Sequence, residues 1–564
     1  MVIILIDVKL FTFNCYILSN INRRPHMTDK KEVMFYTDGR HSSVYMHEPP
    51  MYKKQYVEPI DELLDLGIDT ITYAVGDCSV LLYDTKVGEK WGHNVDLTDH
   101  PIWWKATRNL RSMIERGMDP LMVVCEHAKS KGFQFLPCLL LNLTHTSHGR
   151  VTNCRIADFT TDHPEWSVGP EPEYPEAKYD THGRLSYAVP EVRENRLKVV
   201  KELLCDYPAD GIELSMTIGI APLIARKEVK EHTSTLTDWM KQIRDIGDNA
   251  SQSQGIDKRI ALRLSSTIEG NKEMGIDVER WIKDELVDTV ILDNSGSDGF
   301  EGQTDILREF VQLTKGTNVK ILAGIEATNN TDLTPAVNYA AASNAYHVGA
   351  DGVFFHTYYP MPTRHPYNND TTGRLRFMGH PDVIGSKDKR YRLGIIGDID
   401  KSSEYLNLAL EKSHLNKMSV QLPLELQIGV KSKDIKIYVS DDVKSTMEVD
   451  RLWKCELQIM LPNTTETDEI EIFWNGTPLP KSIQRWADWV YQLRPRPGYA
   501  VDGYRLHCNL MNEYLPVIGG NLVNILINKR DEQIVDPIRI AEIRVAIDYL
   551  PHRNALRDDE TYED

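Results

Sequence analysis

Two glutamates in short apolar segments are the residues of this chain best suited to chemistry. They are Glu213, in the segment GIELS, and Glu326, in the segment LAGIE. Residues two apart in a strand share a face, so Ile212 and Leu214 suit a helix-covered side and leave Glu213 on the opposite side. A buried Glu must be paired, or its pKa must rise, and a raised pKa is what a general acid for glycosidic cleavage needs. Two carboxylates flanking the scissile bond are the minimum for that reaction.

Further polar residues follow other predicted strands, where side chains could position a ligand. Those expected to bind substrate at strand ends are Asp38, Asp77, Asn142, Arg263, Asp293 and His356. Residues of nearby loops add hydrogen-bonding groups and flat apolar faces suited to sugars, namely His145, Trp91, Trp166, Tyr358 and Tyr359. For Glu213 a purely structural alternative stays open, in which Arg263 holds its carboxylate. For Glu326 the open alternative is a helix-capping or solvent-facing role.

The elements that must position these residues alternate between short apolar strands and amphipathic helices. The predicted strands are 33–36, 70–75, 135–141, 210–214, 260–264, 289–293, 319–326 and 351–356. The predicted helices are 54–66, 103–131 with a break near 117–120, 190–206, 234–246, 277–286, 303–314 and 333–348. Eight such units, with no glycine-rich phosphate turn after the first strand, favour a closed (β/α)8 barrel over a doubly wound sheet.

The pattern changes near residue 390, which indicates a second domain. Alternating strands are predicted at 453–461, 469–474, 503–508, 521–528 and 538–549. Asn475-Gly476 is a signal for a type I′ hairpin turn. We therefore expect an α/β TIM barrel over 31–390 and an accessory β-sandwich over 391–551. Residues 1–30 are predicted to be extraneous to the fold or disordered, and 552–564 to be a disordered acidic tail.

The net charge and the cysteines limit which classes of partner and cofactor are expected. The chain has 564 residues, 65 basic and 83 acidic, and a net charge of −18. Such a charge disfavours nucleic acid and anionic membranes, and neutral or weakly charged ligands remain possible, sugars among them. The two glutamates make a carbohydrate substrate the expected partner. None of the eight cysteines forms a CxxC pair or a zinc-type cluster, so we expect buried free thiols, no metal and no cofactor. Free thiols slightly favour the cytoplasm over secretion.

Several motifs resemble bacterial glycosyl-hydrolase-like barrel families. They occur in the families' order as HPEW at 163–166, PEVR at 190–193, DGIEL at 210–214 and GIDVERW at 275–281. The resemblance covers roughly 33–380 and implies the barrel fold. Glutamates on strands four and seven are also similar to those of the large retaining-glycosidase clan. That likeness implies that Glu213 is the acid/base and Glu326 the nucleophile of a glycoside hydrolase.

Two other functions remain open. Ile212 precedes Glu213 where the clan usually has Asn, and Ser215 stands where the families commonly have Asp. These departures motivate the alternative of a carbohydrate-binding barrel without catalysis. A metal-dependent hydrolase is a third hypothesis, suggested by the spacing of His145 and His148. Under the hydrolase hypothesis, a carboxyl separation of about 5.5 Å predicts retention of configuration, and a separation above about 6.5 Å predicts inversion.

Overall fold

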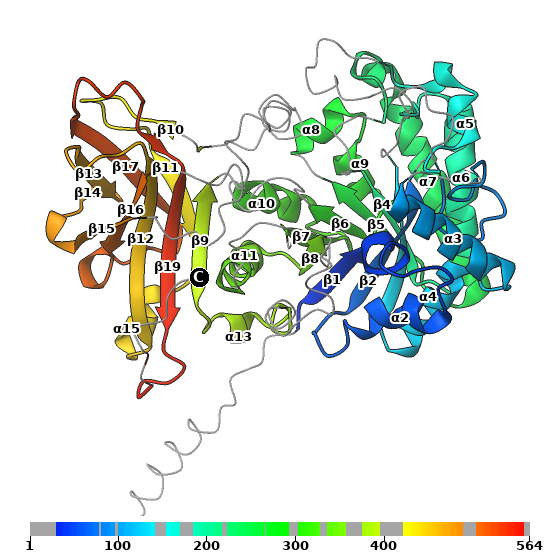
Figure 1. The fold of residues 1–564 in the computed structure, drawn as a ribbon, viewed down its shortest axis with the longest axis horizontal. Helices are drawn as coiled ribbons and strands as arrows, with labels where there is room; N and C mark the ends of the chain where they lie inside the picture. Colours follow the sequence, from blue (N-terminus) through cyan, green and yellow to red (C-terminus); the bar gives the residue numbers. More distant parts are fainter. Residues whose placement is uncertain are drawn as a thin grey trace, which may run out of the picture.

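The computed structural model contains a closed barrel of eight parallel strands in the order β1 to β8 (Figure 1). It describes residues 30–77, 80–95, 100–141, 154–169, 184–216, 223–264, 267–292, 303–326, 335–356, 375–394, 421–422, 424–488, 503–555 and 557. The strands are β1 (Glu32–Thr37), β2 (Thr70–Asp77), β3 (Gln134–Leu140), β4 (Gly211–Ser215), β5 (Arg259–Leu264), β6 (Thr289–Leu292), β7 (Lys320–Glu326) and β8 (Gly352–His356). Each lies within a few residues of its predicted bounds, and β8 pairs with β1 to close the barrel.

Helices cover the outside of the barrel. They are α2 (Lys53–Asp61), α3 (Pro101–Glu115), α4 (Pro120–Ser130), α5 (Asp158–Thr161), α6 (Pro190–Cys205), α7 (Val229–Gln254), α8 (Ile268–Glu273), α9 (Val278–Lys283), α10 (Gln303–Leu313) and α11 (Pro335–Val348). The predicted break between 103 and 131 is the boundary of α3 and α4, where Gly117 adopts a φ of 75° and Pro120 begins α4. Helix α7 is longer than predicted at both ends, because its first and last turns are mostly polar and carry no apolar periodicity.

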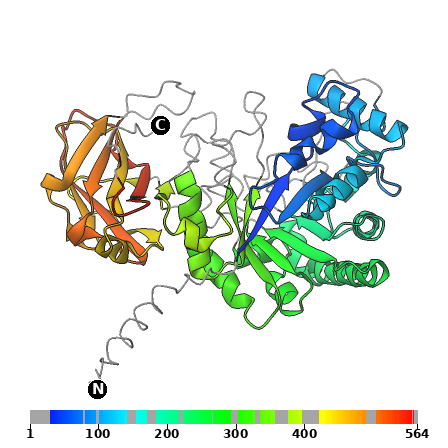
Figure 2. The ribbon, with the colours of Figure 1, turned by 90° about the horizontal axis from the view of Figure 1, so that it is seen from below.

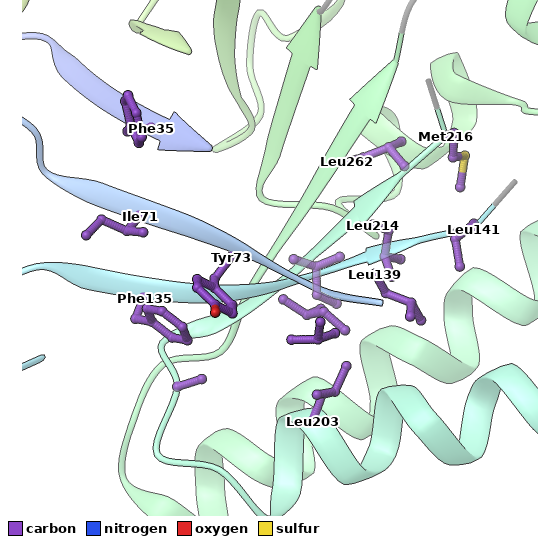
Figure 3. Packing of buried hydrophobic residues seen from close by; sticks show 14 of the residues in the cluster. Phe35, Ile71, Tyr73, Phe135, Leu139, Leu141, Leu203, Leu214, Met216 and Leu262 are labelled. Atoms are coloured by element: carbon purple, nitrogen blue, oxygen red, sulfur yellow. The ribbon is translucent and has the colours of Figure 1, made fainter. Parts of the chain in front are cut away.

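Strand alternation divides the barrel into an outer and an inner core. Ile212 and Leu214 belong to the outer cluster between strands and helices, and Figure 3 shows Leu214 and Leu139 on the side of Leu203 from α6. The inner cluster is small and consists of Met34, Tyr36, Ala74, Leu136, Cys138, Leu140, Ala261, Ile291, Leu322 and Phe354. Cys138 and Ala261 are the backbone partners of Glu213 on the two neighbouring strands. The prediction that Ile212 and Leu214 face the helices is therefore confirmed.

The C-terminal region forms antiparallel sheets. One has the order β15-β16-β12-β19-β9, another the order β11-β17-β13-β14, and β10 pairs with β18. Their bounds are β9 (Lys389–Gly394), β10 (Leu424–Glu425), β11 (Ile435–Val439), β12 (Leu452–Pro462), β13 (Glu469–Trp474), β14 (Thr477–Pro478), β15 (Gln484–Asp488), β16 (Gly503–Asn509), β17 (Gly519–Lys529), β18 (Arg539–Ile540) and β19 (Glu542–Tyr549). The short helices α13 (Pro381–Ile384) and α15 (Val443–Glu448) precede β9 and β12. One hydrophobic cluster contains residues from both larger sheets, for example Leu457 of β12 and Ile525 of β17.

Helix α11 joins the barrel to the C-terminal sheets (Figures 1 and 2). Ala341, Ala342 and Ala345 pack in the outer barrel core, whereas Ala340 packs in the core of the C-terminal sheets. The side-chain amide of Asn344 donates to the carbonyl oxygen of Tyr438 of β11 at 3.2 Å. A helix buried on several sides is expected to be apolar nearly all round, which is what its alanine-rich sequence shows.

The remaining general predictions concern cysteines and termini. Cys125, Cys138, Cys154, Cys455 and Cys508 are buried free thiols, as predicted, and Cys205 is a partly buried one. Within the ranges given above, no helix has both the length and the apolar character that crossing a bilayer requires. The predicted extraneous segment at 1–30 lies outside the described residues except for Lys30. In the predicted tail, Arg557 donates to the Asp388 carboxylate at 2.9 Å.

Candidate active site

The strongest candidate site is a charged pair inside the barrel. Arg263 of β5 places its Nε 2.6 Å from Oε1 of Glu213 of β4, and both side chains are 0% exposed. Arg263 also donates from Nη2 to the sulfur of Cys138 at 3.4 Å. Burying two charges is tolerated only when they are paired, so each requires the other. The structure thus brings together two predicted site residues, Glu213 and Arg263, in the contact that the structural alternative anticipated.

Aromatic rings complete the surroundings of the guanidinium. Its carbon lies 4.2 Å from the centre of the Tyr36 ring of β1 and 5.0 Å from that of Phe354 of β8. The two rings are 6.4 Å apart. A guanidinium over aromatic faces gains electrostatic attraction without needing water. Arg263 therefore reaches across the barrel interior from β5 to the aromatic rings of β1 and β8.

The chemistry available to the neighbours of the pair is limited by burial. Burial raises the pKa of the Cys138 thiol well above its ordinary value, and the charge of Glu213 adds to the effect. Burial likewise raises the pKa of the Tyr36 hydroxyl. Both groups stay protonated, so neither serves as an ionised nucleophile at neutral pH. The pair of Glu213 and Arg263 is therefore the remaining polar contact of this layer.

Asp38 follows β1, and its carboxylate is engaged by the loop that it starts. It accepts hydrogen bonds from the backbone N–H groups of Arg40 and His41 at 3.0 Å and from His41 Nδ1 at 2.5 Å. Burial alone would raise the pKa of Asp38, but these hydrogen bonds and the charge of Arg40 outweigh it and hold the pKa well below its usual range. The carboxylate therefore orders the turn at Arg40–Val44. Its expected role in binding substrate remains a proposal.

The second glutamate is placed by its backbone. Glu326 is the last residue of β7, and its register partner is His356, the last residue of β8. Glu326 follows Leu322 and Gly324 at intervals of two, and Leu322 belongs to the inner cluster. Only the backbone is described for Glu326, His356 and Asp77. Asn142, His145, Asp293, Tyr358 and Tyr359 lie outside the described residues.

Two of the predicted aromatic residues have clear surroundings. Trp166 is half-buried, and its ring stacks on His163 with a centre distance of 3.6 Å and an angle of 9°. One face of this indole is therefore already covered. Trp91 is 3% exposed and donates from Nε1 to Thr107. Its inclusion among the sugar-binding aromatics is wrong, because it packs in the outer barrel core.

Sequence reasoning missed the contribution of Tyr36, Cys138 and Phe354. Each lies within an apolar strand, and none of them is one of the polar strand-end residues that the sequence singled out. The available signal was the alternation of side-chain direction along each strand, which places these three residues on the inward face together with Glu213 and Arg263. Contact between residues of β1, β3, β5 and β8 depends on barrel closure.

The one group of three potential metal ligands in the described ranges lies outside the barrel interior. It comprises Glu89, His93 and Asp158, whose ligand atoms are within 4.8 Å of one another. His93 Nε2 lies 2.8 Å from Glu89 and 3.1 Å from Asp158, and His93 Nδ1 lies 3.0 Å from the Lys90 carbonyl oxygen. A doubly protonated imidazole satisfies all three contacts. These groups therefore form an ion-paired link between the loop after β2 and α5.

No protein-family model matches the sequence, and no curated protein matches it. Among solved structures, an endo-1,4-beta-mannanase from Rhizomucor miehei is similar at 12% identity and a TM-score of 0.40, covering 64% of this chain and 96% of that one. The GH36 alpha-galactosidase AgaA from Geobacillus stearothermophilus is similar at 10% identity and a TM-score of 0.35, covering 89% and 56%. The maltogenic alpha-amylase AmyB from Thermotoga neapolitana is similar at 12% identity and a TM-score of 0.32, covering 87% and 98%.

Proposed function

We propose that the chain is a glycoside hydrolase that acts on an oligosaccharide or polysaccharide with Glu213 and Glu326. The observation that carries the proposal is the placement of Glu213. It occupies an inward-facing position of β4 in a closed parallel barrel, two residues before the carboxyl end of the strand. Catalytic groups of such barrels come from the carboxyl ends of their strands, where Glu326 ends β7. The antiparallel C-terminal region would be an accessory β-sandwich domain.

In this proposal Glu213 protonates the leaving oxygen and Glu326 attacks the anomeric carbon. The ion pair adds a requirement, because Oε1 of Glu213 faces the Arg263 guanidinium at 2.6 Å and not a leaving oxygen. Substrate binding must therefore draw the guanidinium away from Glu213 and open the site. Asp38, Asp77, Asn142, His145, Trp166, Asp293, His356 and Tyr358 would bind the sugar or position these groups.

A carbohydrate-binding barrel without catalysis is the second candidate. The observation that favours it is the complete burial of Glu213 and Arg263 in one pair, with Tyr36 and Phe354 against the guanidinium. A pair sealed in this way stabilises the barrel interior and does not need a reacting sugar beside it. This candidate predicts binding of a glycan without release of product.

The test is hydrolysis of a panel of aryl glycosides and polysaccharides by the wild-type chain and by Glu326→Gln, Glu213→Gln and Glu309→Gln. Glu309 is an exposed residue of α10 and provides the matched control. We expect turnover by the wild type and the control, and a loss of at least about a hundredfold in the other two variants. Full activity of folded Glu326→Gln would contradict the catalytic assignment. A glycan that raises the melting temperature but is never hydrolysed would favour the binding candidate.

A further inference from the structure

A small cavity lies between the loop that follows β2 and helix α6. Its volume is about 90 Å³, and its lining includes Leu81 and Glu89 of the loop, Phe159 of α5, and Arg196 and Val199 of α6. A water molecule needs roughly 10–15 Å³ of such volume, so there is room for several waters or for one small polyatomic ligand. The cavity is separate from the pair of Glu213 and Arg263 inside the barrel.

Arg196 is the unusual residue of this cavity. Its side chain is 3% exposed, and its Nε is buried without a hydrogen-bond acceptor. The other buried arginines of the described chain each face a carboxylate within 4 Å: Arg263 faces Glu213, Arg505 and Arg544 face Glu542, and Arg530 faces Asp468. Across the same described residues, no acidic side chain pairs with Arg196. A buried cation without a partner is strongly destabilising, so a negative group is expected beside it.

The neighbouring acids are engaged elsewhere. Glu89 lines the cavity, but its carboxylate accepts from the backbone N–H groups of Asp158 at 2.6 Å and Phe159 at 2.9 Å and lies 2.8 Å from His93 Nε2. Glu202, one and a half turns further along α6, accepts from the hydroxyls of Tyr83 and Thr85. These contacts fix the loop on α5 and α6 and keep the cavity formed. Among the described residues they leave the charge of Arg196 without a partner.

We propose that this cavity binds a small oxyanion, either a carboxylate or a phosphate-type group, with Arg196 as its charge partner. The planar guanidinium offers paired N–H donors that match two oxygens of such a group. The Asn195 side-chain oxygen, which also lines the cavity and is buried without a donor, can accept from a ligand hydroxyl. The nearby Glu89 carboxylate favours a singly charged ligand over a dianion. This site does not depend on the proposed glycosidase activity.

The experiment measures the melting temperature of the full chain in low-salt HEPES, with sodium acetate, sodium phosphate or sodium chloride added. Arg196→Met removes the buried charge, and Lys201→Met is the matched control, because Lys201 is an exposed cation on the same helix. We expect acetate or phosphate to raise the melting temperature of the wild type and of Lys201→Met by about 2 °C or more. The same salts leave Arg196→Met unchanged, and chloride has no effect on any of them. Acetate acting alone identifies a carboxylate site, and phosphate acting alone identifies a tetrahedral oxyanion site.

Without added anion, Arg196→Met should melt at or above the wild-type temperature, because it removes a buried charge that has no acidic partner in the described part of the chain. If Arg196→Met does not fold, Val199→Phe fills the same cavity without changing the charge and should abolish the response to the anions. An equal rise in all variants, an equal effect of chloride, or no rise in the wild type would overturn the proposal. So would a wild-type response that Val199→Phe retains in full.

Discussion

Replacing Arg263 by Met tests whether the buried pair is the electrostatic centre of the barrel interior. The substitution removes the ion pair of 2.6 Å and leaves the Glu213 carboxylate in a site that is 0% exposed. Breaking a fully buried pair by removing one partner costs about 3–5 kcal/mol. Losing the contacts with Tyr36 and Phe354 adds about 0.5–2 kcal/mol, which the apolar Met side chain partly offsets. We therefore expect a loss of about 4 kcal/mol in the free energy of unfolding of the barrel.

Removing both charges should restore most of that stability. In the double variant Glu213→Met/Arg263→Met, two apolar side chains of similar length occupy the site, and the expected loss is within about 1–2 kcal/mol of the wild type. Arg259→Met is the matched control at the opposite end of the barrel. There Arg259 pairs with Glu32, but the side chains are 15% and 12% exposed, so water can reach the remaining carboxylate. We expect a smaller cost of about 1–2 kcal/mol for this variant.

The assay measures unfolding in urea. Hydrogen-exchange mass spectrometry monitors it on peptides that cover β4 and β5. This readout separates unfolding of the barrel from unfolding of the C-terminal sheets, which a single optical signal would combine. The reasoning is refuted if Arg263→Met costs no more than Arg259→Met. It is also refuted if the double variant is as unstable as Arg263→Met, because the charge left behind would then not be the cause.

Two further predictions concern the elements around the site. The hydrogen bond with Glu89 raises the pKa of His93 to about 9 against its burial, so this link contributes stability that is complete below about pH 6.5 and is lost as the pH rises through 9. The melting temperature of the wild type relative to His93→Asn should therefore fall between pH 6 and pH 10, and a difference that is constant with pH would contradict the assignment. Gly211→Ala should cost at least about 2 kcal/mol, because φ is 146° and an added Cβ would lie 1.9 Å from the Arg259 carbonyl oxygen. A melting temperature equal to that of the wild type would show that β4 can shift freely against β5.

Local sequence was sufficient for most of the secondary structure. The predicted strand 469–474 matches β13 exactly in its bounds, because its alternating residues are set by one buried and one exposed face. The turn signal at Asn475-Gly476 is confirmed by φ values of 49° and 82° and by the pairing of Trp474 with Thr477. Helix ends were less predictable. Helix α2 ends at Asp61, although the apolar residues that predicted it continue to Leu66, and Leu63 and Leu66 stay buried in the following turns.

The sequence by itself determined the order of strands and helices and the inward direction of Glu213, because apolar periodicity and alternation are properties of adjacent residues. Only the tertiary structure decided which groups meet inside the barrel. The contact of Glu213 with Arg263 joins neighbouring strands and was anticipated as the structural alternative. The approach of Arg263 of β5 to Tyr36 of β1 depends on barrel closure, which no local pattern encodes. The local sequence also does not tell apart the two buried arginines. Arg263 of β5 meets a carboxylate, whereas Arg196 of α6 meets none among the described residues. Burial and pairing of a charge depend on residues that are distant in the chain, so only the folded structure reveals them.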